Sequence, residues 1–165
     1  ASKDLPEIVA LLEKAGEYGF CGVSIAEQYG GMDLDFNTGV LFAEANAQGF
    51  SFATTIGAQT SIGSLPIVFY GSEEQKAQYL PGIASGQLKA SYCLTEPGAG
   101  SDANSGKTTA VLTEDGKSYV INGQKMWITN SGFADVFFVF CKIEDDENLS
   151  CLIVHKEWGV KLGAE

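Results

Sequence analysis

The most chemically informative stretch of this sequence is the loop Tyr92-Cys93-Leu94-Thr95-Glu96-Pro97-Gly98-Ala99-Gly100-Ser101-Asp102-Ala103. The loop follows a predicted strand and brings together glycines, hydroxyl side chains and a proline. Glycine allows a backbone to approach a ligand closely, and successive turned N–H groups form concave sites for anions. The stretch therefore predicts a ligand-binding loop.

Two phosphate-binding motifs resemble this loop without matching it. Gly98-x-Gly100-x-x-Ala103 fits the dinucleotide fingerprint, but that motif needs a following helix, because the pyrophosphate lies at the helix N-terminus. Residues 104–112 are instead typical of a turn and then a strand. A P-loop ending in Gly106-Lys107-Thr108 would need a glycine in place of Ser101, and a helix after the lysine. We therefore exclude a Rossmann domain and a P-loop kinase or ATPase.

Downstream of the loop, apolar residues recur at the period of a β-strand. Asp115-Gly116 and Asn122-Gly123 are strong hairpin signals, because both turn positions favour positive φ. Short strands joined by tight turns predict an antiparallel sheet, barrel or sandwich rather than βαβ units. The predicted strands cover residues 89–94, 108–113, 118–122, 125–129, 136–143 and 149–155.

Upstream of the loop, the apolar residues recur at helical spacing. The predicted helices cover residues 5–18, 37–49, 52–69 and 72–80. Asp4 with Glu7, and Ser72 with Gln75, form candidate capping boxes. Pro66 should kink or end the third helix, and Pro81-Gly82 should end the fourth. The sequence thus predicts an α+β chain with a helical domain at residues 1–86 and a β domain at residues 87–165.

Composition and charge limit the classes of partner. Hydrophobic residues make up 45% of the 165 residues, which is typical of a globular protein and too apolar for disorder. No apolar run approaches the roughly 18 residues that a membrane-spanning helix needs. The net charge of −11 disfavours nucleic acid, because an acidic protein repels a phosphate backbone. All ten basic residues are lysines, so a phosphorylated cofactor would be held by backbone N–H groups, hydroxyls and lysines, or by arginines from elsewhere.

The residues that most often form metal or nucleophilic sites show no such pattern. Cys21, Cys93, Cys141 and Cys151 are scattered without a CxxC pair, and buried free thiols are the simplest interpretation. His155, the only histidine, has no serine or aspartate pattern beside it, which indicates a structural role. We expect neither a metal site nor a catalytic triad.

A second motif, Asn122-Gly123-Gln124-Lys125-Met126-Trp127-Ile128-Thr129-Asn130, carries a tryptophan and a threonine two residues apart. On a strand, Trp127 and Thr129 would point to the same face. An indole beside a hydroxyl suits a flat heteroaromatic ligand, although a strand tryptophan more often belongs to a core or an interface.

The two motifs together resemble those of the acyl-CoA dehydrogenase family. The run from Leu94 to Asp102 resembles the family signature, and the run from Lys125 to Asn130 matches its second flavin-contacting segment at the expected separation. Tyr29-Gly30-Gly31, and Leu65-Pro66 before the run from Gly71 to Lys76, resemble its N-terminal domain. The resemblance spans essentially the whole chain and looks closest to the very-long-chain branch.

The resemblance implies that an N-terminal helical domain, a middle β domain and a C-terminal four-helix domain, the last absent here, enclose FAD. Thr95 and Ser101 would bond to the flavin, Trp127 would pack on it away from substrate, and Thr129 would lie near its reactive nitrogen. Ser101 would also contact the CoA ester, and Gly57 would leave the floor of the acyl pocket open for long chains. The implied flavin-binding residues are Tyr92, Cys93, Leu94, Thr95, Glu96, Pro97, Gly98, Ala99, Gly100, Ser101, Trp127, Ile128 and Thr129.

The implied reaction is α,β-dehydrogenation of fatty acyl-CoA thioesters in fatty-acid β-oxidation, with an electron-transfer flavoprotein as acceptor. The resemblance further implies a homodimer or homotetramer, in the cytoplasm of a bacterium or the mitochondrial matrix of a eukaryote. The family's catalytic glutamate would lie beyond Glu165, and Glu96 belongs to the flavin loop. We therefore expect this chain alone to be an inactive fragment that retains little FAD.

Two other functions remain open at the level of sequence. An acyl-CoA oxidase would share the flavin motifs and pass electrons to oxygen. A non-catalytic binding or scaffold module could use the same two domains.

Overall fold

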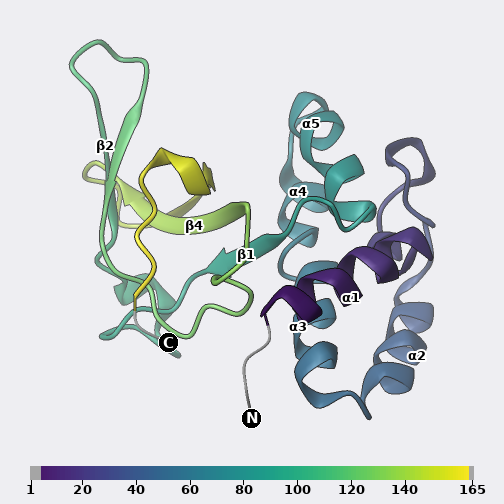
Figure 1. Cartoon of the computed structure of the whole chain (residues 1–165). Coiled ribbons are helices and arrows are strands. Elements are labelled where there is room, and N and C mark those ends of the chain that lie inside the picture. The colour runs from purple at the N-terminus through teal and green to yellow at the C-terminus, as the bar shows by residue number, and fades with distance from the viewer. Residues whose placement is uncertain (1–4, 164–165) are drawn as a thin grey trace.

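Helices and strands occupy separate parts of the chain in the computed structural model, which describes residues 5–163 (Figure 1). The predicted order, a helical part followed by a β part, is confirmed. The helices are α1 (Leu5–Glu17), α2 (Phe36–Asn46), α3 (Phe50–Thr60), α4 (Leu65–Tyr70) and α5 (Glu73–Ala84). The strands are β1 (Ala90–Cys93), β2 (Thr109–Leu112), β3 (Tyr119–Asn122), β4 (Val136–Ile143) and β5 (Leu149–His155).

The two proline predictions have different outcomes. Pro66 lies in the first turn of α4, so the predicted helix 52–69 is divided into α3 and α4. Pro81 does not end α5, which continues to Ala84. A proline removes one hydrogen bond from a helix, here on an exposed face, while burial of Ile83 and Ala84 in the core favours continuation.

The capping predictions were made at α1 and α5. At α5 the reciprocal capping box is confirmed, because Ser72 Oγ accepts from the Gln75 N–H at 3.2 Å and Gln75 Oε1 accepts from the Ser72 N–H at 2.9 Å. The predicted cap Asp4 lies outside the described residues.

The sheet is mixed and open, whereas the sequence predicted a purely antiparallel sheet, barrel or sandwich. β5 pairs antiparallel with β4 along nearly its whole length, and β3 pairs antiparallel with β2. β1 and β2 both pair parallel with β4. The parallel pairs arise because the long segment between β3 and β4 carries the chain back before β4 begins, a connection that turn signals do not reveal.

One edge of β4 is shared by β1 and β2 in succession. Cys93 of β1 pairs with Val139, and Thr109 of β2 pairs with Lys142. The chain therefore advances sixteen residues while β4 advances three. Residues 94–108, hereafter the glycine loop, leave the sheet edge and return to it almost where they left.

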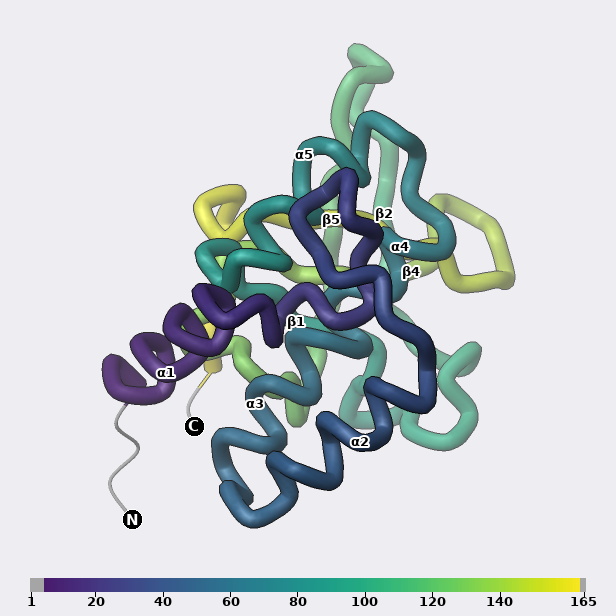
Figure 2. Tube along the Cα trace, turned by 90° about the vertical axis from the view of Figure 1, so that its right-hand side faces the viewer, coloured from purple at the N-terminus to yellow at the C-terminus, as the bar shows by residue number. Residues whose placement is uncertain are grey.

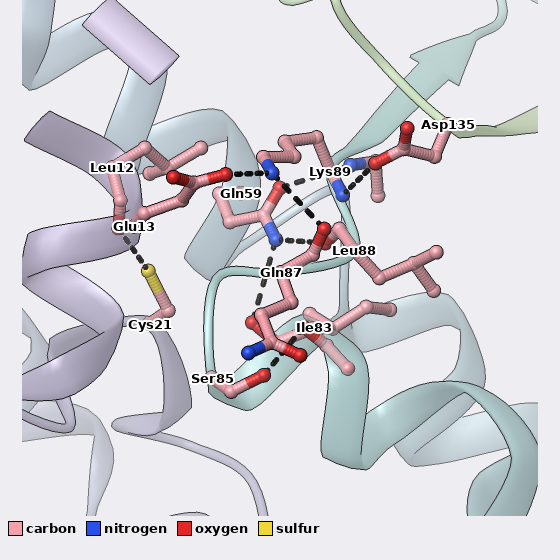
Figure 3. Close-up of polar contacts among 12 residues, drawn as sticks. Leu12, Glu13, Cys21, Gln59, Ile83, Ser85, Gln87, Leu88, Lys89 and Asp135 are labelled. Atoms are coloured by element: carbon pink, nitrogen blue, oxygen red, sulfur yellow. Dashed lines mark hydrogen bonds and ion pairs between the residues drawn. The ribbon is translucent and has the colours of Figure 1, made fainter. Parts of the chain in front are cut away.

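A partly buried polar cluster connects the helices to the start of β1; we call Glu13, Gln59, Lys89 and Asp135 the polar junction (Figure 3). Gln59 of α3 is fully buried; its Nε2 donates to the Leu88 carbonyl at 2.7 Å and its Oε1 accepts from the Ala90 N–H at 2.9 Å. The Lys89 ammonium pairs with Glu13 of α1, and the Lys89 N–H donates to Asp135 at 2.8 Å. These bonds fix α1 and α3 against β1 (Figure 2), directly before the glycine loop.

The main apolar core lies between α5 and the sheet, where Leu80 and Ile83 pack with Val136 and Phe138. A second cluster joins α1 to α3 through Leu12 and Ile56. A third contains Cys93 and Phe137, with Ile128 packed against them. The end of β1, where the glycine loop begins, is therefore anchored in an apolar cluster.

Candidate functional site

The glycine loop opens with a tight turn at Pro97-Gly98. The Glu96 N–H donates to the Ala99 carbonyl at 3.0 Å, and the Ala99 N–H donates back to the Glu96 carbonyl at 3.1 Å. Pro97, Gly98 and Gly100 are exposed, and Ala99 is buried. The turn thus presents proline and glycine backbone outward and anchors itself through Ala99.

Gly98 and Gly100 are not required by the fold. Neither has a φ in the left-handed region, and a Cβ added to either would meet nothing within 4 Å. Gly123, in contrast, could not carry a Cβ, because the Thr108 side chain fills the space above it. Glycine without a conformational or packing reason leaves bare backbone, which suits close approach by a ligand.

The second motif forms an irregular loop, and the predicted strand 125–129 is wrong. We call residues 124–130 the tryptophan segment. Trp127 has a φ of 57° and Asn130 a φ of 68°, both in the left-handed region. A β-strand does not allow this backbone, so Trp127 and Thr129 are not placed by strand alternation.

Hydrogen bonds hold the tryptophan segment against the start of the glycine loop. The Met126 N–H donates to the Thr95 carbonyl at 3.0 Å, and Ser91 Oγ donates to the Thr129 carbonyl at 2.9 Å. Asn130 Nδ2 donates to the carbonyl of Thr55 in α3 at 3.0 Å. The two motifs that the sequence paired are therefore in contact, although not as neighbouring strands.

Trp127 is both strained and exposed. Its side chain is 83% exposed. A bulky residue in the left-handed region costs about 1–3 kcal/mol and persists only where the surroundings impose it. An aromatic side chain held in this way gains nothing from the core of this chain, which makes it the strongest sign of a ligand surface here.

Glu96 faces into the protein and acts on the loop itself. Its carboxylate accepts from the N–H groups of Lys107 at 2.6 Å and Thr108 at 3.0 Å, and it forms a 2.7 Å ion pair with Lys125. Burial alone would raise the pKa of Glu96, but the bonds from Lys125 and from Thr108 and Lys107 outweigh it and hold that pKa at about 2. Such a carboxylate is a poor proton acceptor at neutral pH, so Glu96 is not a general base.

The remaining predicted site residues divide by exposure. Cys93 is buried, which raises the pKa of its thiol to about 12 and makes it unreactive. Ser101 is exposed at the far side of the turn. Tyr92, Leu94, Thr95, Ile128 and Thr129 are half-buried. Within residues 5–163, the hydroxyls of Thr95, Ser101 and Thr129 have no hydrogen-bond partner, so they are available to a ligand.

Gly57 lies on α3, two residues after the Thr55 carbonyl that binds Asn130. A Cβ at Gly57 would meet nothing within 4 Å. The helix that carries the predicted acyl floor is therefore connected directly to the tryptophan segment.

Sequence reasoning missed Lys125, Asn130 and Ser91 as parts of the site. Lys125 bonds the tryptophan segment to the glycine loop, Asn130 bonds it to α3, and Ser91 of β1 bonds to it at Thr129. Lys125 and Asn130 stand inside the second motif, but a lysine is ordinarily read as a solvent-exposed charge.

Two hollows border these elements. One of about 310 Å³ lies beside the glycine loop and is lined by Glu96, Pro97, Gly98, Ser105, Lys107 and Gln124, among others. A larger apolar groove of about 450 Å³ lies between α4 and the sheet, where Phe69, Tyr92 and Phe140 line it. Tyr92 is thus the predicted site residue that faces the apolar groove rather than the hollow beside the loop.

Other chemistry finds little support within residues 5–163. Cys21 and Cys141 are buried free thiols, while Cys151 is exposed. His155 contacts the Tyr79 hydroxyl at 2.9 Å and joins β5 to α5. No three metal-binding side chains lie together in this part of the chain. None of its helices is long and apolar enough to cross a membrane.

Comparison with known families matches both parts of the chain. Residues 2–87 match the model of the acyl-CoA dehydrogenase N-terminal domain, and residues 91–165 match that of the acyl-CoA dehydrogenase middle domain.

Individual relatives are similar over most of this chain. A probable acyl-CoA dehydrogenase of Bacillus subtilis is 55% identical over 95% of this chain and 26% of its own length. The mitochondrial very long-chain specific acyl-CoA dehydrogenase of Rattus norvegicus is 38% identical over 90% of this chain and 24% of its own. The crystal structure of a Bacillus anthracis acyl-CoA dehydrogenase complexed with FAD superposes with a TM-score of 0.90 at 52% identity, covering 93% of this chain and 27% of that chain. The chain thus spans about a quarter of the length of these relatives.

Proposed function

We infer the function from one premise: this chain belongs to the acyl-CoA dehydrogenase family. We propose that it supplies the flavin-facing surface of an FAD-dependent oxidoreductase that α,β-dehydrogenates fatty acyl-CoA thioesters. We further propose residues 1–86 and 87–165 as its two domains. The observation that carries the proposal is Trp127, strained and exposed beside a loop of bare glycine backbone.

The residues present fit a flavin. An isoalloxazine is flat and aromatic, and the exposed indole of Trp127 offers a stacking surface for it. The open space above Gly98 and Gly100 allows close approach, and the unpartnered hydroxyls of Thr95, Ser101 and Thr129 offer polar contacts. These contacts need no arginine, which agrees with a sequence that has none.

We assign the flavin contacts to Tyr92–Ser101 and Trp127–Thr129. When bound, FAD supplies the redox chemistry by accepting a hydride. Trp127 would set the plane of the ring, and Thr129 would place a hydroxyl near its edge. Glu96 would hold the loop without exchanging a proton, because its pKa of about 2 keeps it ionised.

The finer proposal concerns the acyl chain. The space above Gly57 is open, and α3 is tied to the tryptophan segment through Thr55 and Asn130. We propose that this opening admits long acyl chains, in keeping with the name of the rat relative. A bulky residue at this position would close the floor of the pocket.

The remaining partners are proposed on family grounds. We propose an electron-transfer flavoprotein as electron acceptor and a homodimer or homotetramer as the assembled enzyme. The setting would be the cytoplasm of a bacterium or the mitochondrial matrix of a eukaryote.

Flavin fluorescence tests the cofactor proposal in the full-length enzyme. Added FAD is expected to be quenched on binding, because the indole of Trp127 stacks on the ring. Trp127→Phe should lessen the quenching, and Trp127→Asn should abolish it. Trp158→Phe is the matched control. Trp158 is also exposed, at 65%, but it follows β5 and lies outside both the glycine loop and the tryptophan segment. Equal quenching by wild type and Trp127→Asn would refute the assignment.

A helix substitution tests the chain-length proposal in the full-length enzyme. Gly57→Leu should reduce turnover of long acyl-CoAs by about tenfold or more and leave turnover of short ones unaffected. The added side chain would fill the space for the end of a long acyl chain, which costs at least about 1.4 kcal/mol of binding free energy. Gly39→Leu in α2 is the control, since the space above Gly39 is equally open. A sharp short-chain optimum in the wild type would contradict the proposal.

A further inference from the structure

We propose that Lys125 is a positioning residue whose ammonium, with the Glu96 carboxylate, holds the glycine loop and the tryptophan segment in the arrangement that flavin binding requires. The inference rests on the proposed function and adds the element that shapes the site. We call this pair the loop clasp.

The first half of the clasp closes the glycine loop. Glu96 stands near the beginning of the loop, whereas Lys107 and Thr108 stand at its end. The carboxylate accepts an N–H from each of them, at 2.6 and 3.0 Å. One side chain therefore joins the two ends of the loop. Without it, only the pairing of β1 and β2 with β4 would hold these ends near each other.

The second half of the clasp attaches the tryptophan segment. The Lys125 ammonium donates to Glu96 Oε1 at 2.7 Å and to the Leu94 carbonyl at 3.1 Å. These acceptors flank Thr95, whose carbonyl accepts the Met126 N–H at 3.0 Å. Three bonds thus fix Lys125 and Met126, the two residues before Trp127, to the three residues before the Pro97-Gly98 turn.

The environment makes this pair hard to replace. The Lys125 and Glu96 side chains are only 11% and 7% exposed, so water cannot substitute for either partner. The ion pair between Lys76 and Glu73 differs in this respect, with side chains 22% and 73% exposed on the surface of α5. A strained Trp127 needs an imposed backbone, and the clasp acts two residues away from it.

The sheet does not depend on the clasp. β1 and β2 pair with β4 through their own backbone bonds, and neither Glu96 nor Lys125 lies in a strand. Loss of the clasp should therefore loosen the loops while the sheet remains folded.

Three variants separate positioning from simple stability. Lys125→Met removes the ammonium but leaves Glu96 buried and unpaired. The double variant Glu96→Gln with Lys125→Met removes both charges, so no buried charge remains to destabilise the fold. Lys76→Met is the matched control, because it removes the same charge from an exposed ion pair.

Two measurements are made on each variant of the full-length enzyme. The first is FAD affinity by flavin fluorescence; the second is amide hydrogen exchange without FAD, at Lys107, Thr108 and Met126. We expect Lys125→Met and the double variant to weaken FAD binding by about tenfold or more and to speed exchange at the three amides. Lys76→Met should match the wild type in both measurements.

The outcomes distinguish this inference from the proposed function. Wild-type FAD affinity in the double variant would overturn the inference, because the pair would then serve stability alone. Unchanged amide exchange in both Lys125 variants would overturn it as well. A full-length wild-type enzyme that gives no flavin signal would refute the proposed function and the flavin role of the clasp, and exchange would still show whether Lys125 joins the loops.

Discussion

Buried polar groups have different roles in the polar junction and in the tryptophan segment. In the polar junction, the Gln59 amide is fully buried and bonded on both sides, and the chain around it is unstrained. In the tryptophan segment, Lys125 and Asn130 hold a backbone in which Trp127 is strained and points into solvent. Polar contacts at the junction stabilise the fold, whereas those at the segment maintain a conformation that the fold alone would not choose.

The largest effect on stability is expected at Gln59 of the polar junction. Gln59→Leu should lower the free energy of unfolding by about 3 kcal/mol, because the Leu88 carbonyl and the Ala90 N–H lose their buried partner. Urea denaturation measures this loss. Gln78→Leu, at an exposed position of α5, should change stability little. Equal losses in both variants would show that the junction bonds carry no special weight.

Acid should weaken the glycine loop through Glu96. Its pKa falls from an ordinary 4.5 to about 2 on folding, so its contribution is complete above about pH 4.5 and is lost as the pH falls toward 2. The stability difference between wild type and Glu96→Gln should therefore be largest near neutral pH and shrink between these values. Denaturant titrations of both proteins at several pH values test this, and a constant difference would contradict it.

A smaller effect is expected at Lys89. Lys89→Met should lower the free energy of unfolding by about 1–2 kcal/mol, because its partner Glu13 is half exposed and can be rehydrated. FAD affinity should not change, in contrast to Lys125→Met. Lys14→Met, at an exposed position of α1, is the control for lost charge. Weaker FAD binding in Lys89→Met would contradict this prediction, because the polar junction would then affect ligand binding as the loop clasp does.

The smallest effect on stability is expected at the residue most important for the ligand. Trp127→Asn should change the free energy of unfolding by less than about 1 kcal/mol, because asparagine tolerates the left-handed region and little burial is lost. Thermal denaturation without FAD provides the measurement. A loss of about 3–5 kcal/mol, as for a core aromatic, would show that Trp127 is part of the packing.

Local signals in the sequence were sufficient for much of the fold. β4 and β5 begin and end where the period-two pattern predicted, and the Ser72 cap was predicted from four residues. The strand directions were not, because β1 pairs with a strand more than forty residues away and no local pattern encodes that partner. Pro81 shows the same limit, since tertiary burial outweighed a local helix breaker.

In the candidate site, too, local features were predicted and features set by distant partners were missed. Both motifs were identified from the sequence, and the bond between Met126 and Thr95 holds them together. The geometry of that contact was missed, because alternation along 125–129 indicated a strand where hydrogen bonds to Ser91 and Thr55 impose left-handed turns. A positive φ at tryptophan cannot be predicted from residue preference, which argues against it.

Because β1 and β2 share one edge of β4, the glycine loop is an insertion between two strands that could otherwise be continuous. Because β1 and β2 meet the same edge in the same direction, a two-residue spacer in place of residues 94–108 would join them into one continuous strand with its register kept. The sheet register therefore sets no length for this segment. Ligand chemistry could then diversify here by changes in the glycine loop together with the tryptophan segment bonded to it, while the sheet keeps its register.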